Sequence, residues 1–192
     1  LYRGLAKGPM AIVAPITAVA CATLPVIWGL FSGEKLSTQQ IVGVFVGLFA
    51  IFLVSWTPGE QASIKGMLVV EALIAGLAFG AFFIVIDGTS ETTAPWPVVG
   101  SRVFSVAAIF LFVLIGRKNI KPKGNSTPYI IGAGFFDTLA NVVLLAALNR
   151  GMLSLVSVLA SFYPAVTVLL ARVFLKEMML KSQIVGLALG LT

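Results

Sequence analysis

The sequence contains no histidine and a single cysteine, Cys21. Without histidine, the chain cannot carry a catalytic or metal-binding scheme that depends on an imidazole. One cysteine cannot form a disulfide within the chain or a cysteine-based zinc site. Cys21 lies in an apolar run, which is typical of an inert buried thiol. We therefore expect no catalytic residue, no metal site and no cofactor.

Charge is also scarce. Only 10% of the 192 residues are charged and 59% are hydrophobic, whereas a soluble domain has roughly 25% and about 45–50%. A chain of this size cannot bury so much apolar surface from water, so its solvent is expected to be lipid. The net charge of +6 is then a property of the loops of a membrane protein. We expect a lipid bilayer as partner and no nucleic acid.

Long apolar runs predict the secondary structure. A helix that crosses a bilayer needs about 20 residues, and six runs reach this length, while a seventh starts near Ser182 and is cut short. The six runs cover residues 9–31, 38–56, 66–86, 96–116, 128–148 and 152–174. They are too long for barrel strands and lack the alternation of such strands. The prediction is an all-α membrane protein, a polytopic helical bundle.

The tetrapeptide QIVG occurs twice, at residues 40–43 and 183–186. A shift of 143 residues lays residues 1–49 over 144–192 without a gap, and thirteen positions are identical. Among them are matches that apolar composition does not explain: Glu34 with Glu177, Gly43 with Gly186, and Gly47 with Gly190. The pattern predicts an internal duplication.

The same period predicts the size of the parent protein. The third predicted helix, near Gly66, opens the second copy, so we expect a fragment of a parent with about ten helices, five in each copy. About seven of these helices are present. An odd number of spans per copy gives the two copies opposite orientations in the membrane, and inverted repeats are a transporter architecture.

Two stretches carry a resemblance to a known family, PVIWGLFSGEKLSTQQIVGVFVGLFAIFLVS and GMLSLVSVLASFYPAVTVLLARVFLKEMMLKSQIVGLALG. Both resemble the end of an EamA repeat of the drug/metabolite transporter superfamily. The resemblance implies that residues 1–58 are the C-terminal part of a first EamA repeat and that residues 66–192 are a second repeat, truncated in its last helix. It also implies turn glutamates at Glu34 and Glu177 and a mid-helix proline at Pro164, where the first copy has Cys21 instead.

Four glycines follow the two turns at helical spacing: Gly43, Gly47, Gly186 and Gly190. A glycine at every fourth position lets helix backbones approach closely, so we interpret them as helix-packing positions.

Asp137 and Asn141 stand in the middle of the fifth apolar run, four residues apart and hence on one helix face. A carboxylate at this depth costs at least about 2.5–3.5 kcal/mol on insertion scales, so it is expected to face an interior cavity or a partner. Two interpretations stay open: a substrate or proton site, and a structural polar contact between helices.

Arg102 lies one to two turns into the fourth run, at nearly the depth of Asp137 in an antiparallel neighbour. It is expected either to pair with Asp137, to meet an anionic substrate group, or to extend toward the interface. Glu71, six residues into the third run, has two readings as well: a residue that lines a vestibule, and an interfacial carboxylate.

A stripe of small residues, Ser154, Ser157, Ser161 and Pro164, follows one face of the sixth run. Small residues permit tight packing and hydroxyls can bond across helices. The alternative is one wall of a central cavity, with Tyr163 and Pro164 at its midpoint, because Pro164 frees a backbone carbonyl there.

The basic residues predict one membrane orientation and the family implies the other. Segments 117–123 and 172–181 lie on the side of Lys7, whereas the opposite side holds Lys35, Arg102 and Arg150. The positive-inside rule puts the Lys7 side in the cytoplasm. The resemblance implies cytoplasmic termini, which would put segment 117–123 outside, so orientation stays open.

These features favour an integral membrane transporter of the cell membrane that moves small metabolites or drug-like molecules by alternating access, as a proton-coupled or facilitative carrier. The sequence has no GK[ST] after a glycine run, so we expect no ATP hydrolysis and no enzyme. The alternative is a non-transporting membrane protein, a sensor or an assembly subunit. A small-molecule substrate is the expected partner, and a homodimer is a further candidate.

Overall fold

The computed structural model describes residues 10–56, 66–89, 91–116, 126–176 and 178–191. The described residues are almost entirely helical and contain no strand, which confirms the predicted all-α class. Glu177, the start of the first run at Pro9, Lys7 and the basic segment 117–123 lie outside the described residues.

Eight α-helices are present in the described part of the chain. They are α2 (Met10–Phe31), α3 (Thr38–Ser55), α4 (Gly66–Asp87), α5 (Trp96–Gly116), α6 (Thr127–Leu148), α7 (Leu153–Ala160), α8 (Tyr163–Leu170) and α9 (Lys181–Gly190). A short 3-10 helix, η1 (Glu91–Thr93), precedes α5, and a π-helical turn, η3 (Ala171–Leu175), follows α8. Within the described chain, six segments are long and apolar enough to cross a membrane, with α7, α8 and η3 together forming the sixth.

The chain divides into two compact units. The first unit comprises Leu1–Val85 and Gly151–Thr192, and the second comprises Ile86–Arg150. The first therefore holds α2, α3, most of α4, and α7 to α9, and the second holds η1, α5 and α6.

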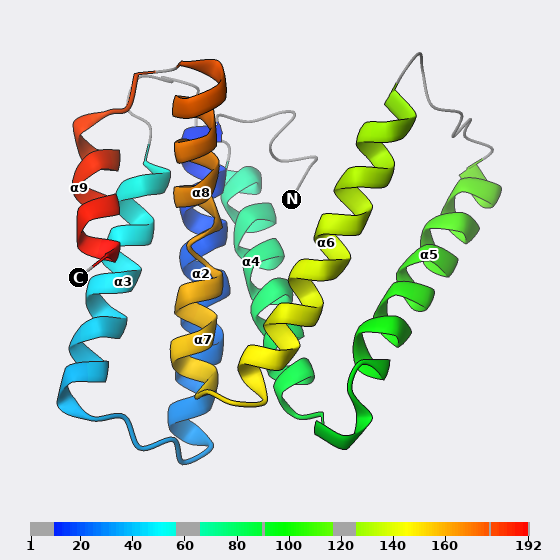
Figure 1. Ribbon diagram of the computed structural model, residues 1–192, viewed down its shortest axis with the longest axis horizontal. Helices are drawn as coiled ribbons and strands as arrows, with labels where there is room; N and C mark the ends of the chain where they lie inside the picture. The colour runs from blue at the N-terminus through cyan, green and yellow to red at the C-terminus, as the bar shows by residue number, and fades with distance from the viewer. Residues whose placement is uncertain (1–9, 57–65, 90, 117–125, 177, 192) are drawn as a thin grey trace. The chain divides into compact units, whose positions relative to one another are not determined.

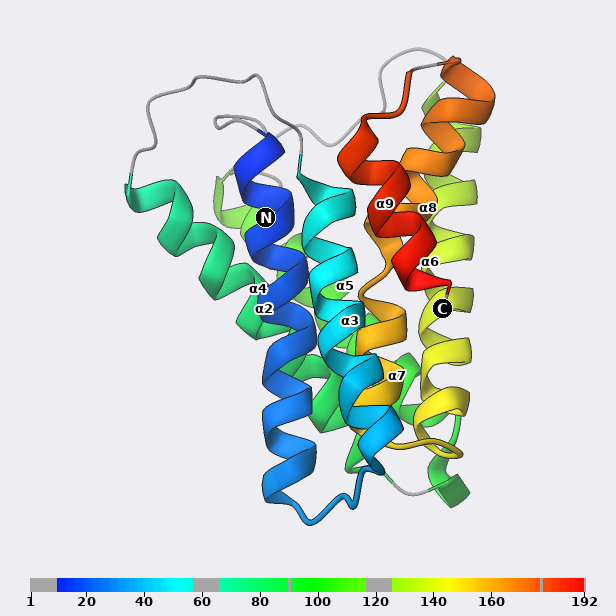
Figure 2. The ribbon, with the colours of Figure 1, turned by 90° about the vertical axis from the view of Figure 1, so that its left-hand side faces the viewer.

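The first unit contains two helical hairpins, α2–α3 and α7/α8–α9 (Figure 1). Their helices begin one period of 143 residues apart, at Met10 and Leu153 and again at Thr38 and Lys181. The α2 helix runs antiparallel to α7 and α8, and α9 packs along α3 (Figure 2). Their shared core consists of Ala18, Ala22, Val26, Val44, Ile51 and Val158. The two hairpins are thus inverted with respect to each other.

The second helix of each hairpin begins with the same hydrogen bond. The Gln40 side chain accepts from the Ser37 N–H at 2.8 Å, and the Gln183 side chain accepts from the Leu180 N–H at 3.0 Å. Each glutamine is the first letter of QIVG and satisfies a backbone donor just before the first turn, as the third residue of a capping box does.

The apolar run over residues 152–174 forms one candidate membrane span, as predicted, and the structure divides it into α7 and α8. Pro164 has no N–H to donate to the Ala160 carbonyl and its ring crowds that carbonyl. The adjacent bonds shorten to three-residue spacing, from the Phe162 N–H to Leu159 O at 3.1 Å and from the Ala165 N–H to Phe162 O at 2.9 Å. The break therefore lies in the middle of the span.

Candidate functional site

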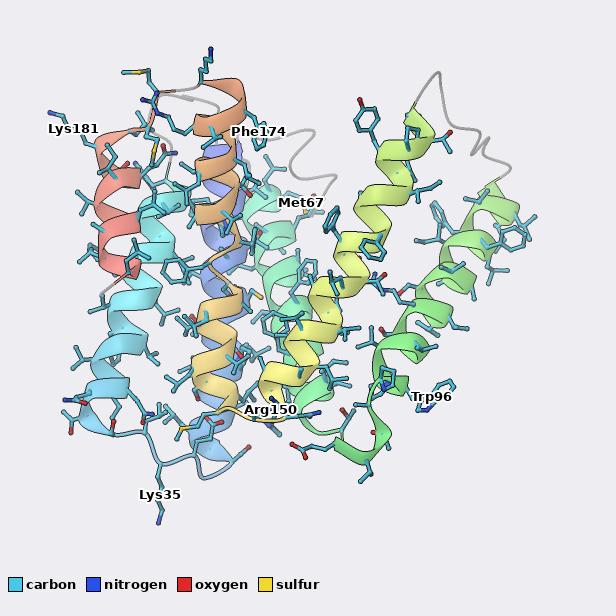
Figure 3. The ribbon with its side chains drawn as sticks, in the orientation of Figure 1. Lys35, Met67, Trp96, Arg150, Phe174 and Lys181 are labelled. Carbon is cyan, nitrogen blue, oxygen red and sulfur yellow. The ribbon has the colours of Figure 1, made fainter. Side chains whose placement is uncertain are left out.

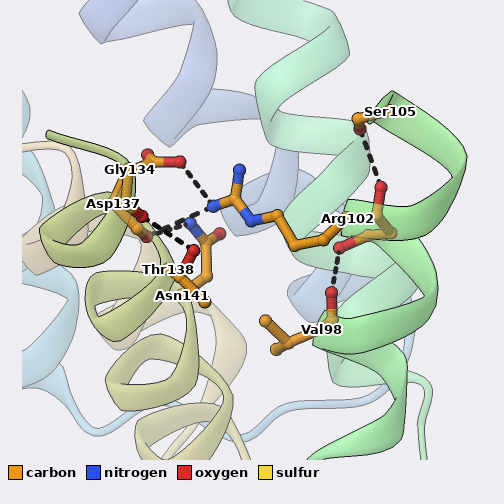
Figure 4. Close-up of polar contacts among 8 residues, drawn as sticks. Val98, Arg102, Ser105, Gly134, Asp137, Thr138 and Asn141 are labelled. Carbon is orange, nitrogen blue, oxygen red and sulfur yellow. Dashed lines mark hydrogen bonds and ion pairs between the residues drawn. The ribbon is translucent and has the colours of Figure 1, made fainter. Parts of the chain in front are cut away.

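The second unit is a hairpin of α5 and α6 that carries opposite charges on facing helices (Figure 4). The Arg102 Nη2 atom of α5 lies 2.6 Å from the Asp137 Oδ2 atom of α6. The same nitrogen also donates to the Asp137 main-chain oxygen at 3.2 Å. Of the three alternatives for Arg102, this geometry favours pairing with Asp137.

Asn141 joins this pair from the next turn of α6. Its side-chain amide donates to the Asp137 main-chain oxygen at 2.8 Å. Arg102 and Asn141 therefore converge on one carbonyl, and the four-residue spacing of Asp137 and Asn141 does put them on one helix face. Arg102, Asp137 and Asn141 are hereafter the ion-pair site.

Both side chains of the ion pair keep exposed surface within the described residues. In this chain, the Asp137 side chain is 60% exposed and the Arg102 side chain 35% exposed, and the Arg102 Nε atom is enclosed with no hydrogen-bond partner among the described residues. Charges at membrane depth are stable only against protein, water or a bound group. The Asp137 carboxylate can therefore take up a proton or accept a hydrogen bond from a polar ligand.

A small pocket opens at one end of the same unit. It has a volume of about 290 Å³ and is lined by Glu91, Ala94, Pro95, Val142, Leu145, Ala146, Asn149 and Arg150. Trp96 and Arg150 lie at this end (Figure 3). One carboxylate and one guanidinium lie in its wall beside apolar side chains, so the pocket presents both charges near the end of the hairpin.

The predicted serines lie in the first unit and are fully buried. Ser157 and Ser161 are 0% exposed, and Ser157 donates to Leu153 O at 2.6 Å. Ser161 stands at the break between α7 and α8. This burial favours tight packing over a cavity wall. Tyr163, the first residue of α8, is 46% exposed.

Glu71 lies on α4 and is half-buried. No hydrogen bond or ion pair is recorded for it within the described chain, so its role as a vestibule residue stays a prediction. A separate apolar pocket of about 460 Å³ is lined by residues of α2, α3 and α4. Its lining is Pro15, Ile16, Val19, Ala20, Thr23, Leu24, Ile27, Phe52, Leu73 and Leu77.

The four glycines predicted to pack helices have different surroundings. A Cβ atom on Gly47 would lie 2.7 Å from Val158 Cγ1, and one on Gly190 would overlap the Phe162 ring. A Cβ atom on Gly186 would lie 2.9 Å from the Ala50 carbonyl oxygen. At Gly43 nothing in the described chain lies within 4 Å. Three of these positions thus make close helix contacts within this chain, and Gly43 makes none.

Glu34, which was predicted only as a turn residue, also connects the two hairpins of the first unit. Its carboxylate accepts hydrogen bonds from the Leu153 N–H at 2.6 Å, from the Ser154 N–H at 3.2 Å and from the Ser154 hydroxyl. These groups form the first turn of α7, where backbone donors lack helical partners. Sequence reasoning missed this contact, because it placed Glu34 only as a turn residue of the family.

Comparison with known proteins agrees with the membrane-spanning helices described above. A model of the EamA-like transporter family matches residues 65–192. An uncharacterized protein of Methanocaldococcus jannaschii is 29% identical over 130 residues, which is 68% of this chain and 90% of that protein. No solved structure matches the chain. Because the family model covers most of the sequence, the chain belongs to the EamA-like transporter family, whose members are membrane transporters.

Proposed function

We propose that the protein is a secondary carrier that moves small polar molecules across the cell membrane by alternating access. In this proposal the two inverted hairpins of the first unit belong to two EamA repeats, residues 1–58 and 66–192. The ion-pair site of Arg102, Asp137 and Asn141 binds the substrate or the coupling proton. Family membership supports transport in general, and the features below support the mechanism.

The observation that carries the proposal is the ion pair between Arg102, in the second turn of one membrane span, and Asp137, in the middle of the next span. Ionised side chains inside a membrane are expensive and typically mark substrate pathways and proton relays. The Arg102 Nε atom makes no hydrogen bond among the described residues, so the guanidinium keeps a donor beyond its contacts with Asp137. The pair is therefore suited to exchange partners.

Two states follow from the chemistry of this pair. With Asp137 ionised, Arg102 is neutralised within the protein and the site carries no net charge. A proton or a cationic group on Asp137 releases the guanidinium, which then accepts an anionic group of a substrate. Binding and proton transfer are coupled in this scheme because both compete for one carboxylate.

The inverted hairpins support alternating access. Transporters with inverted repeats rock one repeat against the other around a central site, and broken helices near mid-membrane are common in them. The first unit contains hairpins that run in opposite directions, and the second of these hairpins is broken before Pro164. This asymmetry gives the second hairpin a hinge that the first lacks.

The experiment is a flux measurement. Cells that express the protein are first screened for resistance to toxic metabolite analogues, and the compounds found are then loaded into proteoliposomes. The proposal predicts saturable release that accelerates when the same compound is present on the outer side, as exchange through one alternating site requires. Release that is linear with concentration and insensitive to external compound would contradict it and would favour a non-transporting membrane protein.

A further inference from the structure

We propose that Glu34 is a conformational latch. Its carboxylate holds the first turn of α7 against the α2–α3 turn and thereby closes one end of the first unit. The hydrogen bonds break when the protein opens toward that end. This inference rests on the proposed alternating-access function, but its test does not depend on a substrate.

The latch joins two chain segments that are far apart in sequence. Glu34 belongs to the turn of the first hairpin, while Leu153 and Ser154 begin the second hairpin, 119 and 120 residues later. One carboxylate satisfies two backbone N–H groups and one hydroxyl at the positive end of a helix. It is therefore placed to hold or release the second hairpin as a whole.

Gly29 makes room for the carboxylate. A Cβ atom built at this position would overlap Glu34 Oε2 and would lie 2.6 Å from the Ser154 hydroxyl oxygen. Any side chain on residue 29 would therefore displace either the carboxylate or the start of α7. A substitution at Gly29 is therefore a second way to open the latch, and it leaves the charge of Glu34 unchanged.

The geometry favours a latch over a fixed structural contact for two reasons. Glu34 is only half-buried, so water can replace its partners when the bonds open. The α7 helix ends at Ala160, before the break that precedes Pro164. A short helix with a break behind it can tilt away from α2 without moving α8, and the latch controls its free end.

Accessibility of Ser157 reports the state of the latch. Ser157 is 0% exposed and lies one turn beyond Ser154 in α7. In a background with Cys21→Ala, the single cysteine of Ser157→Cys is treated with a hydrophilic maleimide that is present on both sides of intact membranes. Adding Glu34→Gln removes the charge-assisted bonds and is expected to raise the labelling rate about tenfold. Gly29→Ala is expected to have a similar effect.

Val54 provides the matched control. It is 1% exposed and lies at the end of α3 remote from Glu34, where it contacts the Gly186 position. A Val54→Cys variant is expected to stay unlabelled with Glu34→Gln and with Gly29→Ala.

Two results would overturn the latch: an unchanged labelling rate at residue 157 in both variants, or an equal rise in the labelling rate at residues 157 and 54, which would mean general loosening of the protein. Failure of the proposed function would instead appear as absent solute exchange in the unaltered protein.

Discussion

The two hairpins of the first unit come from matching stretches of sequence, yet they are not equivalent. They agree in local features. Their helices start one period apart, and Gln40 and Gln183 make the same hydrogen bond at the second start. A residue with positive φ also ends the first helix of each, Gly33 at 95° and Lys176 at 56°, again one period apart.

They differ in what surrounds them. Gly43 has open space where a Cβ atom would stand, whereas its counterpart Gly186 lies against the backbone of α3. The α2 helix is continuous although it contains Pro15 and Pro25, whereas the second hairpin is broken before Pro164. Turn chemistry is local and is kept in both copies, while packing depends on neighbours that the copies do not share. The next three predictions each compare a substitution in one copy with a substitution in the other.

The largest effect is expected at the paired glycines of QIVG. Gly186→Val should destabilise the folded protein by about 3 kcal/mol, because its side chain overlaps the Ala50 carbonyl and overpacking against backbone cannot relax easily. Gly43→Val should change stability by no more than about 0.5 kcal/mol, since that position is open. Thermal unfolding in detergent measures both. Equal effects would show that the two copies pack alike.

The second largest effect is expected from closing the helix break before Pro164. Pro164→Ala restores an N–H for the Ala160 carbonyl, so α7 and α8 should join into one helix. If the break serves as a hinge, exchange of a transported compound should slow by about tenfold, which corresponds to about 1.4 kcal/mol in the opening step. Pro25→Ala, in the continuous α2 helix, is the control and should leave exchange nearly unchanged. Comparable slowing in both variants would remove the functional difference between the hairpins.

The smallest effect is expected at the two turn residues with positive φ. A non-glycine residue in the left-handed region is strained by roughly 1–2 kcal/mol. Lys176→Gly should therefore stabilise the protein by about 1 kcal/mol, and Gly33→Lys should destabilise it by a similar amount. Chemical denaturation of the purified protein tests both. Destabilisation by Lys176→Gly would mean that the lysine side chain contributes more than its backbone strain.

Much of the fold follows from the sequence because lipid leaves few choices. Apolar runs of about 20 residues must be helices in a bilayer, and the repeat of QIVG located the helix starts near Thr38 and Lys181. The missing N–H of Pro164 indicated a bent or broken helix at that point, whereas α2 shows that a helix can also continue through proline when neighbours support it.

The candidate site was partly predictable. Four-residue spacing put Asp137 and Asn141 on one face, and similar depth suggested that Arg102 reaches Asp137. The bonds of Glu34 to Leu153 and Ser154 were not predictable in this way, because they join segments about 120 residues apart and depend on how the hairpins pack. The different packing of Gly43 and Gly186 could not be predicted either, because it also depends on how the hairpins pack.

The most direct test of the central claim is proton-coupled accumulation by an Asp137→Asn variant. In proteoliposomes with an inward proton gradient, the unaltered protein is expected to accumulate a compound that it exchanges. Asp137→Asn should keep a measurable exchange of that compound but lose gradient-driven accumulation, because the amide cannot take up and release a proton in the cycle. Accumulation that is equal in the two proteins, at equal amounts of folded protein, would contradict the role of the ion pair as the coupling site.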